Sequence, residues 1–278
     1  MLLRVGTRGS RLALTQAEQA AERLRAPGIE IALVPITTAG DRDRTKPFGE
    51  IGSRGVFVKE LEEALLDGRI DVAVHSAKDM TSTETDGLVV GAYLAREDPR
   101  DALCGADALR AGMRVGTASV RRRAQLLALE PSLSVEQLRG NIDTRLRKRG
   151  ERRLDAVVLA ACGLDRLGLG GEIGYRFEPG ELLPEAGQGS LALQVRVGEK
   201  DLVAAVDDAD TRARVEAERR CVAVVGGGCL APVAAYHDGA ALEGLVADEE
   251  GRWIERRRGG DPDALGRELA AAAAARGS

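Results

Sequence analysis

Apolar and polar residues along the first 75 positions switch between the two-residue period of a strand and the 3.6-residue period of a helix. Ser10 stands directly before a helical pattern and is of a residue type that caps helix starts. The segment at residues 38–55 shows neither period and is long for a connection, which is typical of a functional loop. The pattern predicts a lobe built on a parallel sheet, with strands at residues 2–6, 29–37 and 70–75 and helices at residues 10–25 and 56–66.

The same pattern returns after a polar run at residues 96–101, which predicts a crossing into a second lobe. A run with two prolines at residues 178–185 predicts the crossing back, and a strand at residues 191–197 rejoins the first lobe. Two crossings between α/β lobes imply a central cleft, the usual place for a small ligand. The second lobe is expected to contain strands at residues 113–116, 134–138 and 156–160, and helices that begin at Ser119 and at Asp143.

After residues 207–210 the pattern changes to a helix at residues 212–224, a glycine-rich loop, short strands and an alanine-rich helix from Asp261. This order indicates a third, small α+β domain. The predicted domains are residues 1–95 with 188–208, residues 96–187, and residues 209–278.

The composition narrows the choice of partners. A chain of 278 residues that is 44% hydrophobic can bury sizeable cores. Its net charge of -4 and its 3% aromatic content argue against nucleic acid, since neither a basic surface nor stacking platforms are indicated. We expect no export signal and no membrane segment. The four cysteines have no C-x-x-C spacing and the chain has only two histidines, so we expect no structural zinc.

Several polar groups follow the apolar strand at residues 70–75, where ligands of α/β sheets bind. Asp79 is the best candidate for a general acid or base, because a carboxylate in a cleft can move a proton and stabilise positive charge. Lys78 beside it is suited to bind a substrate carboxylate. His75 is more simply a structural histidine.

Arginines gather at three junctions where a strand passes into a helix, near Arg8, in the loop at residues 116–123, and near Arg139. Helix starts bind anions, and a guanidinium grips a carboxylate through two hydrogen bonds. Each arginine alone is also consistent with a solvated surface charge, and the excess of Arg over Lys with genomic composition. Because the arginines recur at matching strand ends in both lobes, we predict a site for a small polycarboxylate.

Cys229 lies in a glycine-rich loop that leaves room for something large beside the sulfur. A thiol is intrinsically nucleophilic, but the residue is equally consistent with a small buried hydrophobe. No nearby histidine supports a cysteine-dependent hydrolase, which would have to use His75 or His237. For Cys104, Cys162 and Cys221 we expect a structural place.

Taken together and in order, the motifs resemble those of the porphobilinogen deaminases, also called hydroxymethylbilane synthases. The resemblance covers nearly the whole chain. The motifs are Thr7-Arg8 with Ser10, residues 55–61, His75-Ser76-Ala77-Lys78-Asp79, residues 96–101, Arg139-Gly140-Asn141 with Thr144-Arg145, Gly187-Gln188-Gly189, and Gly227-Gly228-Cys229.

The resemblance implies two periplasmic-binding-protein-like α/β lobes with a central cleft, plus a small C-terminal α+β domain. It implies a dipyrromethane cofactor attached to Cys229 through a thioether, with Asp79 assisting loss of ammonia and stabilising a cationic azafulvene. The loop at residues 43–55 resembles the family's flexible lid. The cofactor-binding residues implied are Ser76, Lys78, Thr117, Ser119, Arg121, Arg122, Arg139, Asn141 and Arg145, and the substrate-binding residues are Arg8, Ser10, Phe57 and Gln188.

The implied enzyme is a cytoplasmic monomer that adds four porphobilinogen units head to tail and binds neither nucleic acid nor membrane. The chain departs from the family at Gly9, Arg54, Ala118 and the pair Met80-Thr81, none of which removes Asp79 or Cys229. Without the resemblance, the strongest rival is a non-catalytic binding protein that closes on an anion. An exported receptor of that kind needs a signal peptide, and a regulatory one usually needs a DNA-binding module.

Overall fold

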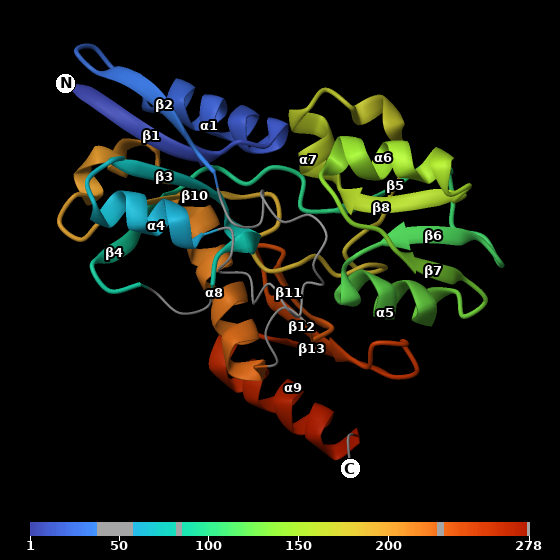
Figure 1. Cartoon of the computed structure of the whole chain (residues 1–278). Coiled ribbons are helices and arrows are strands. Elements are labelled where there is room, and N and C mark those ends of the chain that lie inside the picture. Colours follow the sequence, from blue (N-terminus) through green and yellow to red (C-terminus); the bar gives the residue numbers. More distant parts are fainter. Residues whose placement is uncertain (38–57, 82–84, 227–230, 277–278) are drawn as a thin grey trace. The chain divides into compact units, whose positions relative to one another are not determined.

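The structure is a computed structural model, and it describes residues 1–37, 58–81, 85–226 and 231–276 (Figure 1). The chain divides into two compact units. The first unit is Met1–Glu97 with Ser190–Ala213, and the second unit is Asp98–Gly189 with Arg214–Ser278. The division into three domains at the boundaries given above stays a prediction.

The first unit is built on a five-stranded sheet with the order β2-β1-β3-β10-β4. Strands β1 and β2 are parallel, β1 and β3 are parallel, and β10 is antiparallel to both of its neighbours, β3 and β4. The strands are β1 (Leu2–Arg8), β2 (Glu30–Ile36), β3 (Val72–Ser76), β4 (Leu88–Tyr93) and β10 (Leu191–Arg196).

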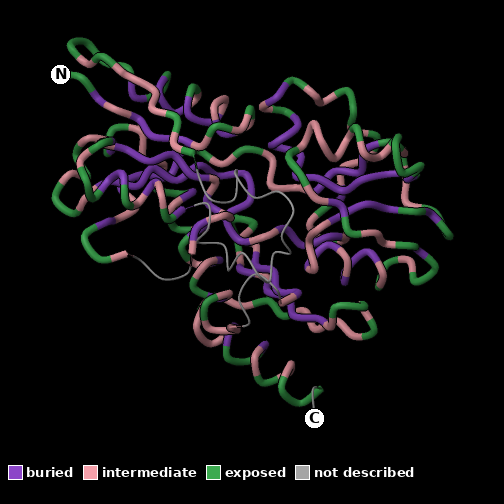
Figure 2. Tube along the Cα trace, in the orientation of Figure 1, coloured by how far each residue is buried: buried purple, intermediate pink, exposed green. Residues whose placement is uncertain are grey.

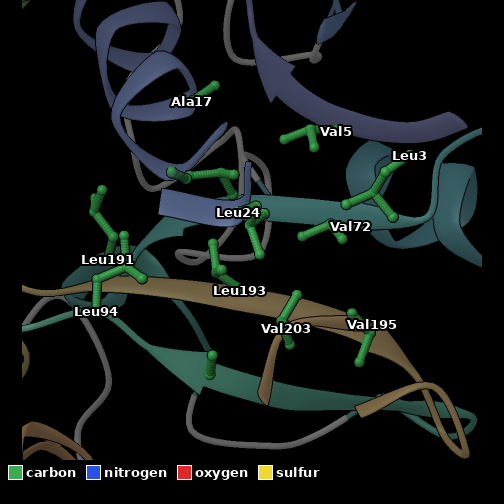
Figure 3. Close-up of a cluster of buried hydrophobic side chains, with 13 residues drawn as sticks. Leu3, Val5, Ala17, Leu24, Val72, Leu94, Leu191, Leu193, Val195 and Val203 are labelled. Carbon is green, nitrogen blue, oxygen red and sulfur yellow. The ribbon is translucent and has the colours of Figure 1, made fainter. Parts of the chain in front are cut away.

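Two helices pack on this sheet, α1 (Arg11–Leu24) and α4 (Lys59–Leu66). Helix α1 begins where Ser10 accepts a hydrogen bond from the Ala13 N–H, so one of the unpaired donors of the first turn is satisfied. Strand side chains alternate in direction, and Val72 and Val74 join the core under α1 while Ala73 joins the core with α4. Figure 3 shows the first of these cores, which includes Leu3, Val5, Leu24, Val72 and Leu193.

The second unit repeats this order in a sheet of its own, β7-β6-β8-β5-β9. Strands β6, β7 and β8 are parallel, and β5 is antiparallel to its neighbours β8 and β9. In each sheet the antiparallel strand directly follows a predicted crossing. The strands are β5 (Asp101–Cys104), β6 (Arg114–Thr117), β7 (Ser134–Gln137), β8 (Ala156–Ala160) and β9 (Ile173–Arg176).

Three helices belong to this sheet, α5 (Val120–Leu129), α6 (Ile142–Glu151) and α7 (Ala161–Arg166). Strands β5 and β8 are buried along their whole lengths, as the purple trace in Figure 2 shows. A strand covered on both faces reads as a continuous apolar run, which is what the sequence of β8 contains.

The C-terminal part of the second unit contains the antiparallel sheet β11-β12-β13 and the helix α9 (Pro262–Arg276), which packs on it. Helix α8 (Ala209–Val225) precedes this sheet. A small core joins Cys221 to Leu242, Leu265 and Leu269. The strands are β11 (Val233–His237), β12 (Leu242–Ala247) and β13 (Ile254–Gly259).

The predicted fold class, two α/β lobes and a small α+β part, is confirmed by these three sheets. Strands β4, β5 and β9 and helix α7 were not predicted, since each is short and lacks a clear period. Within the described part of the chain, no helix is both long enough and apolar enough to cross a bilayer.

Candidate active site

Two of the predicted site segments lie at the carboxyl edge of the first sheet. Strand β1 ends at Arg8 and its parallel neighbour β3 ends at Ser76, so the backbone leaves both strands at the same edge of the sheet. Ser10, predicted to bind substrate, caps α1 at this edge. Arg8 and Ser10 therefore lie at the same edge of the sheet as the residues that follow Ser76.

Lys78 and Asp79 lie in a single 3-10 turn, Ala77–Asp79, directly after β3. Two backbone hydrogen bonds hold the turn: the Ala77 N–H donates to the Ser190 carbonyl at 3.0 Å, and the Met80 N–H donates to the Ala77 carbonyl at 3.4 Å. Both side chains are half-buried. A carboxylate and an ammonium group on one fixed turn can bind an anion and stabilise a developing cation side by side.

The carboxyl edge of the second sheet collects the arginine-rich segments. The parallel strands β6, β7 and β8 end at Thr117, Gln137 and Ala160, and each is followed by a helix on the same edge. Ser119 caps α5 by accepting from the Arg122 N–H, and Asn141 caps α6 by accepting from the Thr144 N–H. These two predicted cofactor-binding side chains thus form the helix starts themselves.

Thr117 is buried and its hydroxyl accepts a hydrogen bond from the Ser119 N–H at 3.2 Å. Arg145 donates from Nε to the Gly140 carbonyl at 2.7 Å, and Lys148 donates to the Arg139 carbonyl at 3.1 Å. Gly140 has a φ of +123°, and a Cβ there would lie 2.6 Å from the Thr144 methyl carbon, so this turn requires glycine. These two hydrogen bonds hold the backbone of the turn between Arg139 and Arg145.

Arg121 and Arg122 are buried together against Asp101, the first residue of β5. Their side chains are 3% and 6% exposed, and that of Asp101 is fully buried. Arg121 Nη1 donates to Asp101 Oδ2 at 2.8 Å, while Arg122 donates from Nη2 and Nε to Asp101 Oδ1 at 2.7 and 3.0 Å. One buried carboxylate therefore forms ion pairs with two buried guanidinium groups.

Gln188 completes this cluster. The residue is fully buried and donates from Nε2 to Asp101 Oδ1 at 2.8 Å and to the Pro99 carbonyl at 2.7 Å. The structure places it with the buried arginine pair of the second unit. Its role in binding substrate stays a prediction.

The charges in this cluster shift the pKa of its carboxyl group. Burial by itself raises the pKa of Asp101, but the positive charges of Arg121 and Arg122 and their hydrogen bonds outweigh it and lower the pKa far below the ordinary 3.8. Burial favours the neutral form of Arg122, yet the charge of Asp101 and its hydrogen bond raise the pKa of that guanidinium above its ordinary value. Asp101 and Arg122 therefore both stay charged across the physiological pH range.

Arg121 also has donors that the described residues leave unsatisfied. Its Nη1 donates to Asp101 and to the Leu183 carbonyl, whereas its Nε and Nη2 are buried and meet no hydrogen-bond acceptor among the described residues. A buried guanidinium with unpaired N–H groups is costly, and an anion is the ligand that satisfies it. Arg121 thus fits a group that carries carboxylate arms.

Arg166 and Asp101 lie at the same edge and were missed from the sequence. Arg166 ends α7, the helix that follows β8, and its Nη2 donates to the Gly189 carbonyl at 3.0 Å. Its place after a parallel strand, as for Lys78 and Arg121, was the signal available. The sequence pattern places Asp101 at the end of a polar crossing and gives no sign of its burial.

Cys229, Phe57 and the loop at residues 43–55 fall outside the described residues. Their predicted roles as cofactor anchor, substrate contact and lid stay predictions. Across the ranges that the structure does describe, no three His, Cys, Asp or Glu side chains are grouped as metal ligands.

Cys104, Cys162 and Cys221 are buried free thiols. Burial raises the pKa of Cys104 and of Cys221 to about 11, so about one molecule in a thousand carries either thiolate at pH 8. We expect both to resist iodoacetamide at pH 8 in the folded protein and to react once guanidinium unfolds it. Peptide mapping by mass spectrometry measures this, and rapid labelling of Cys104 before unfolding would contradict its burial.

Fold and site together define a class. It is an α/β protein in which the carboxyl edges of two sheets carry arginines and one edge also carries the turn with Lys78 and Asp79, side chains of a kind that suits a small polyanion. Comparison with known proteins narrows this class. Residues 3–204 match the family model described as porphobilinogen deaminase, dipyromethane cofactor binding domain. The chain belongs to the porphobilinogen deaminase family, and it has the dipyrromethane cofactor domain of that family.

Full-length relatives support the assignment. The porphobilinogen deaminase of Syntrophotalea carbinolica is 44% identical, with 99% of this chain and 93% of that protein covered. The porphobilinogen deaminase of Acidithiobacillus ferrooxidans is 45% identical, with 99% and 95% covered. Among solved structures, a TRAP periplasmic solute binding protein from Ralstonia eutropha H16 is similar at 12% identity and a TM-score of 0.43, with 77% of this chain and 81% of that chain covered. The strand orders, rather than this last likeness, define the fold.

Proposed function

We propose that the chain couples four porphobilinogen molecules head to tail and releases hydroxymethylbilane, with Asp79 as the catalytic carboxylate. The activity itself, that of a porphobilinogen deaminase, follows from the family. The observation that carries it is identity of 44–45% to porphobilinogen deaminases over 99% of the chain. The residue roles below are proposals that the geometry supports.

Each coupling breaks the bond between the aminomethyl carbon of porphobilinogen and its amine, and joins that carbon to the unsubstituted ring carbon of the terminal pyrrole of the growing chain. That ring carbon loses its hydrogen as a proton, which the released ammonia takes up. Ammonia leaves, and the ring that loses it develops positive charge. Asp79 accepts a hydrogen bond from the pyrrole N–H and stabilises this charge, because a fixed carboxylate already oriented toward a cation needs no reorganisation. The backbone hydrogen bonds that hold the turn Ala77–Asp79 support this role.

The acetate and propionate arms of the pyrroles require cationic partners. We assign this binding to Arg8 and Lys78 in the first unit and to Arg121, Arg122, Arg139 and Arg145 in the second. Arg121 is the best supported of these, since its unpaired buried Nε and Nη2 fit a carboxylate. Each charged hydrogen bond contributes roughly 1.5–3 kcal/mol.

When bound, the dipyrromethane supplies the covalently held end to which new pyrroles are added. We propose that Cys229 anchors it and that Arg121 and Arg122 hold its arms. Asp101 holds both arginines in place through hydrogen bonds. Ser119 and Thr117 set the start of the helix that carries them.

Intact-mass spectrometry of the wild type and of Cys229→Ser tests the anchor. We expect the wild type to be heavier than its sequence by one dipyrromethane and the variant to have its sequence mass, because a hydroxyl forms no such thioether. Cys221→Ser is the matched control, since Cys221 is buried, and it should keep the added mass. Equal masses for wild type and Cys229→Ser, apart from the substitution, would refute the anchor.

We also propose, on the resemblance, that the enzyme acts as a monomer in the cytoplasm. Light scattering coupled to size exclusion measures the first part: the expected mass is close to the 29.4 kDa of one chain. A stable dimer at micromolar concentration would contradict it.

A further inference from the structure

A series of hydrogen-bonded polar side chains, two buried and two half-buried, connects α4 to the end of β3 in the first unit. Gln194 of β10 donates from Nε2 to Glu62 Oε1 of α4 at 2.8 Å, and its Oε1 lies 2.9 Å from His75 Nε2. Thr85 donates to the other oxygen of Glu62 at 2.8 Å. His75 and Gln194 are 5% and 3% exposed. The order is Thr85, Glu62, Gln194, His75.

Strand register explains how His75 and Gln194 meet. In the antiparallel pair of β3 and β10, His75 is opposite Ala192 and Gln194 is opposite Ala73. His75 and Gln194 are thus diagonal neighbours on one face of the sheet. Ala73 on that face belongs to the apolar core under α4, together with Leu61 and Leu65. The polar chain therefore crosses an otherwise apolar interface.

The direction of each hydrogen bond follows from the chemistry of the groups. A carboxylate only accepts, so Glu62 requires the amide nitrogen of Gln194 on its side. The opposite orientation of the amide would set two acceptor oxygens against each other. With its nitrogen committed to Glu62, Gln194 presents its oxygen to His75, and His75 Nε2 must then carry the hydrogen. In the neutral ring Nδ1 is left with the lone pair.

The position of His75 links these hydrogen-bonded side chains to the turn that bears Lys78 and Asp79. Three residues separate it from Asp79 along the chain, and Ser76 is the last residue of β3 before the turn Ala77–Asp79. An imidazole held on the α4 face fixes the end of the strand from which the turn emerges. Packing alone would favour apolar side chains here, since a buried polar group contributes only when it is fully hydrogen-bonded.

We infer that Gln194 and Glu62 are positioning residues for the coupling reaction: they hold His75 as the Nε2–H tautomer and thereby fix the turn that bears Lys78 and Asp79. The inference rests on the proposed role of that turn. It assigns no contact with substrate to either residue.

The tautomer is directly measurable, because the chain contains only two histidines, His75 and His237. Long-range proton–nitrogen correlation spectra of protein labelled with ¹⁵N-histidine distinguish an N–H nitrogen from a lone-pair nitrogen, and His237→Gln assigns the signals. We expect His75 to be Nε2–H in the wild type. In Glu62→Gln the amide of residue 194 is free to turn, and the tautomer is expected to lose this preference. Thr85→Val removes only the outermost link and should leave the tautomer unchanged.

Kinetics then separate positioning from packing. Gln194→Leu and Glu62→Gln are expected to lower kcat on the order of tenfold with KM for porphobilinogen little changed, since misplacement of a catalytic group affects the chemical step. The double variant Glu62→Gln with Gln194→Glu exchanges the amide and the carboxylate. The amide at residue 62 then donates to a carboxylate at residue 194, which again accepts from His75 Nε2. It should restore both the tautomer and most of kcat.

Three outcomes would overturn the inference. These are an Nδ1–H tautomer in the wild type, an unchanged kcat in folded Gln194→Leu, and a double variant that regains the tautomer without regaining kcat. Melting temperatures establish that each variant is folded at the assay temperature. Failure of the proposed function would look different, because wild-type protein would then form no hydroxymethylbilane whatever the tautomer of His75.

Discussion

Asp101→Asn is expected to destabilise the second unit by about 3–5 kcal/mol, because it leaves two buried guanidinium groups without a counter-charge. Asp101 is fully buried and accepts hydrogen bonds from Arg121, Arg122 and Gln188. An asparagine keeps the shape but removes the charge and turns one acceptor into a donor that faces a guanidinium. Calorimetry should show a fall in Tm on the order of 10 °C for a unit of this size.

Asp98→Asn is the matched control for this prediction. Asp98 also binds two arginines, Arg100 and Arg176, but its side chain is 20% exposed. Water can replace part of what the substitution removes, so a smaller fall in Tm is expected. Equal losses for Asp98→Asn and Asp101→Asn would contradict the argument that burial makes the Asp101 cluster critical.

The same carboxyl group gives stability a dependence on acid. Its pKa is lowered in the folded state, from an ordinary 3.8, by Arg121 and Arg122 acting against burial. The contribution of Asp101 is therefore complete above its unfolded pKa, close to 4, and is lost progressively as the pH falls below that value. In Asp101→Asn this part of the acid dependence should be absent.

Helix starts and fully buried strands could be predicted from the sequence. Ser10 and Ser119 were predicted to begin helices, and both cap α1 and α5 as expected, because an N-cap depends only on residues within one turn. Strand β8 was likewise marked by a continuous apolar run. The fold class followed from the order of these elements.

The hydrogen-bond partner that Arg121 and Arg122 share could not be predicted in the same way. The sequence placed Arg121 and Arg122 at a helix start that faces an anion, but it gave no sign that Asp101, some 20 residues earlier, is buried beside both. That contact depends on β5 inserting antiparallel to β8, with Asp101 opposite Ala160. Pairing between distant strands is set by tertiary packing, which no local pattern encodes.

The hydrogen-bonded series of Thr85, Glu62, Gln194 and His75 could not be predicted from the sequence for a related reason. His75 was interpreted as structural, which holds for its burial but leaves out its hydrogen bond to Gln194, 119 residues away. Gln194 lies in β10, a strand whose position was predicted correctly. A single polar residue in an apolar run does not indicate which residue it will bond to.

Asp79→Asn is expected to lower the rate of hydroxymethylbilane formation by roughly 100- to 10,000-fold, the range over which a positioned acid–base group usually acts. The amide keeps the shape of the carboxylate and its place in the turn Ala77–Asp79, so folding should be unaffected. It cannot balance the positive charge that develops as ammonia leaves. Binding of the acidic arms depends on other side chains, so KM should change much less than kcat.

Asp86→Asn removes a carboxylate of the same unit from an exposed turn and should leave kcat and KM near the wild-type values. Asp79→Glu keeps the charge but displaces it by one methylene, and an intermediate rate is expected if placement matters as well as charge. The comparison with Gln194→Leu is informative, since a positioning defect should resemble Asp79→Glu more than Asp79→Asn. A folded Asp79→Asn enzyme with near-normal turnover would remove Asp79 from the reaction and leave the arginine-lined edges as a binding site whose catalytic group lies elsewhere.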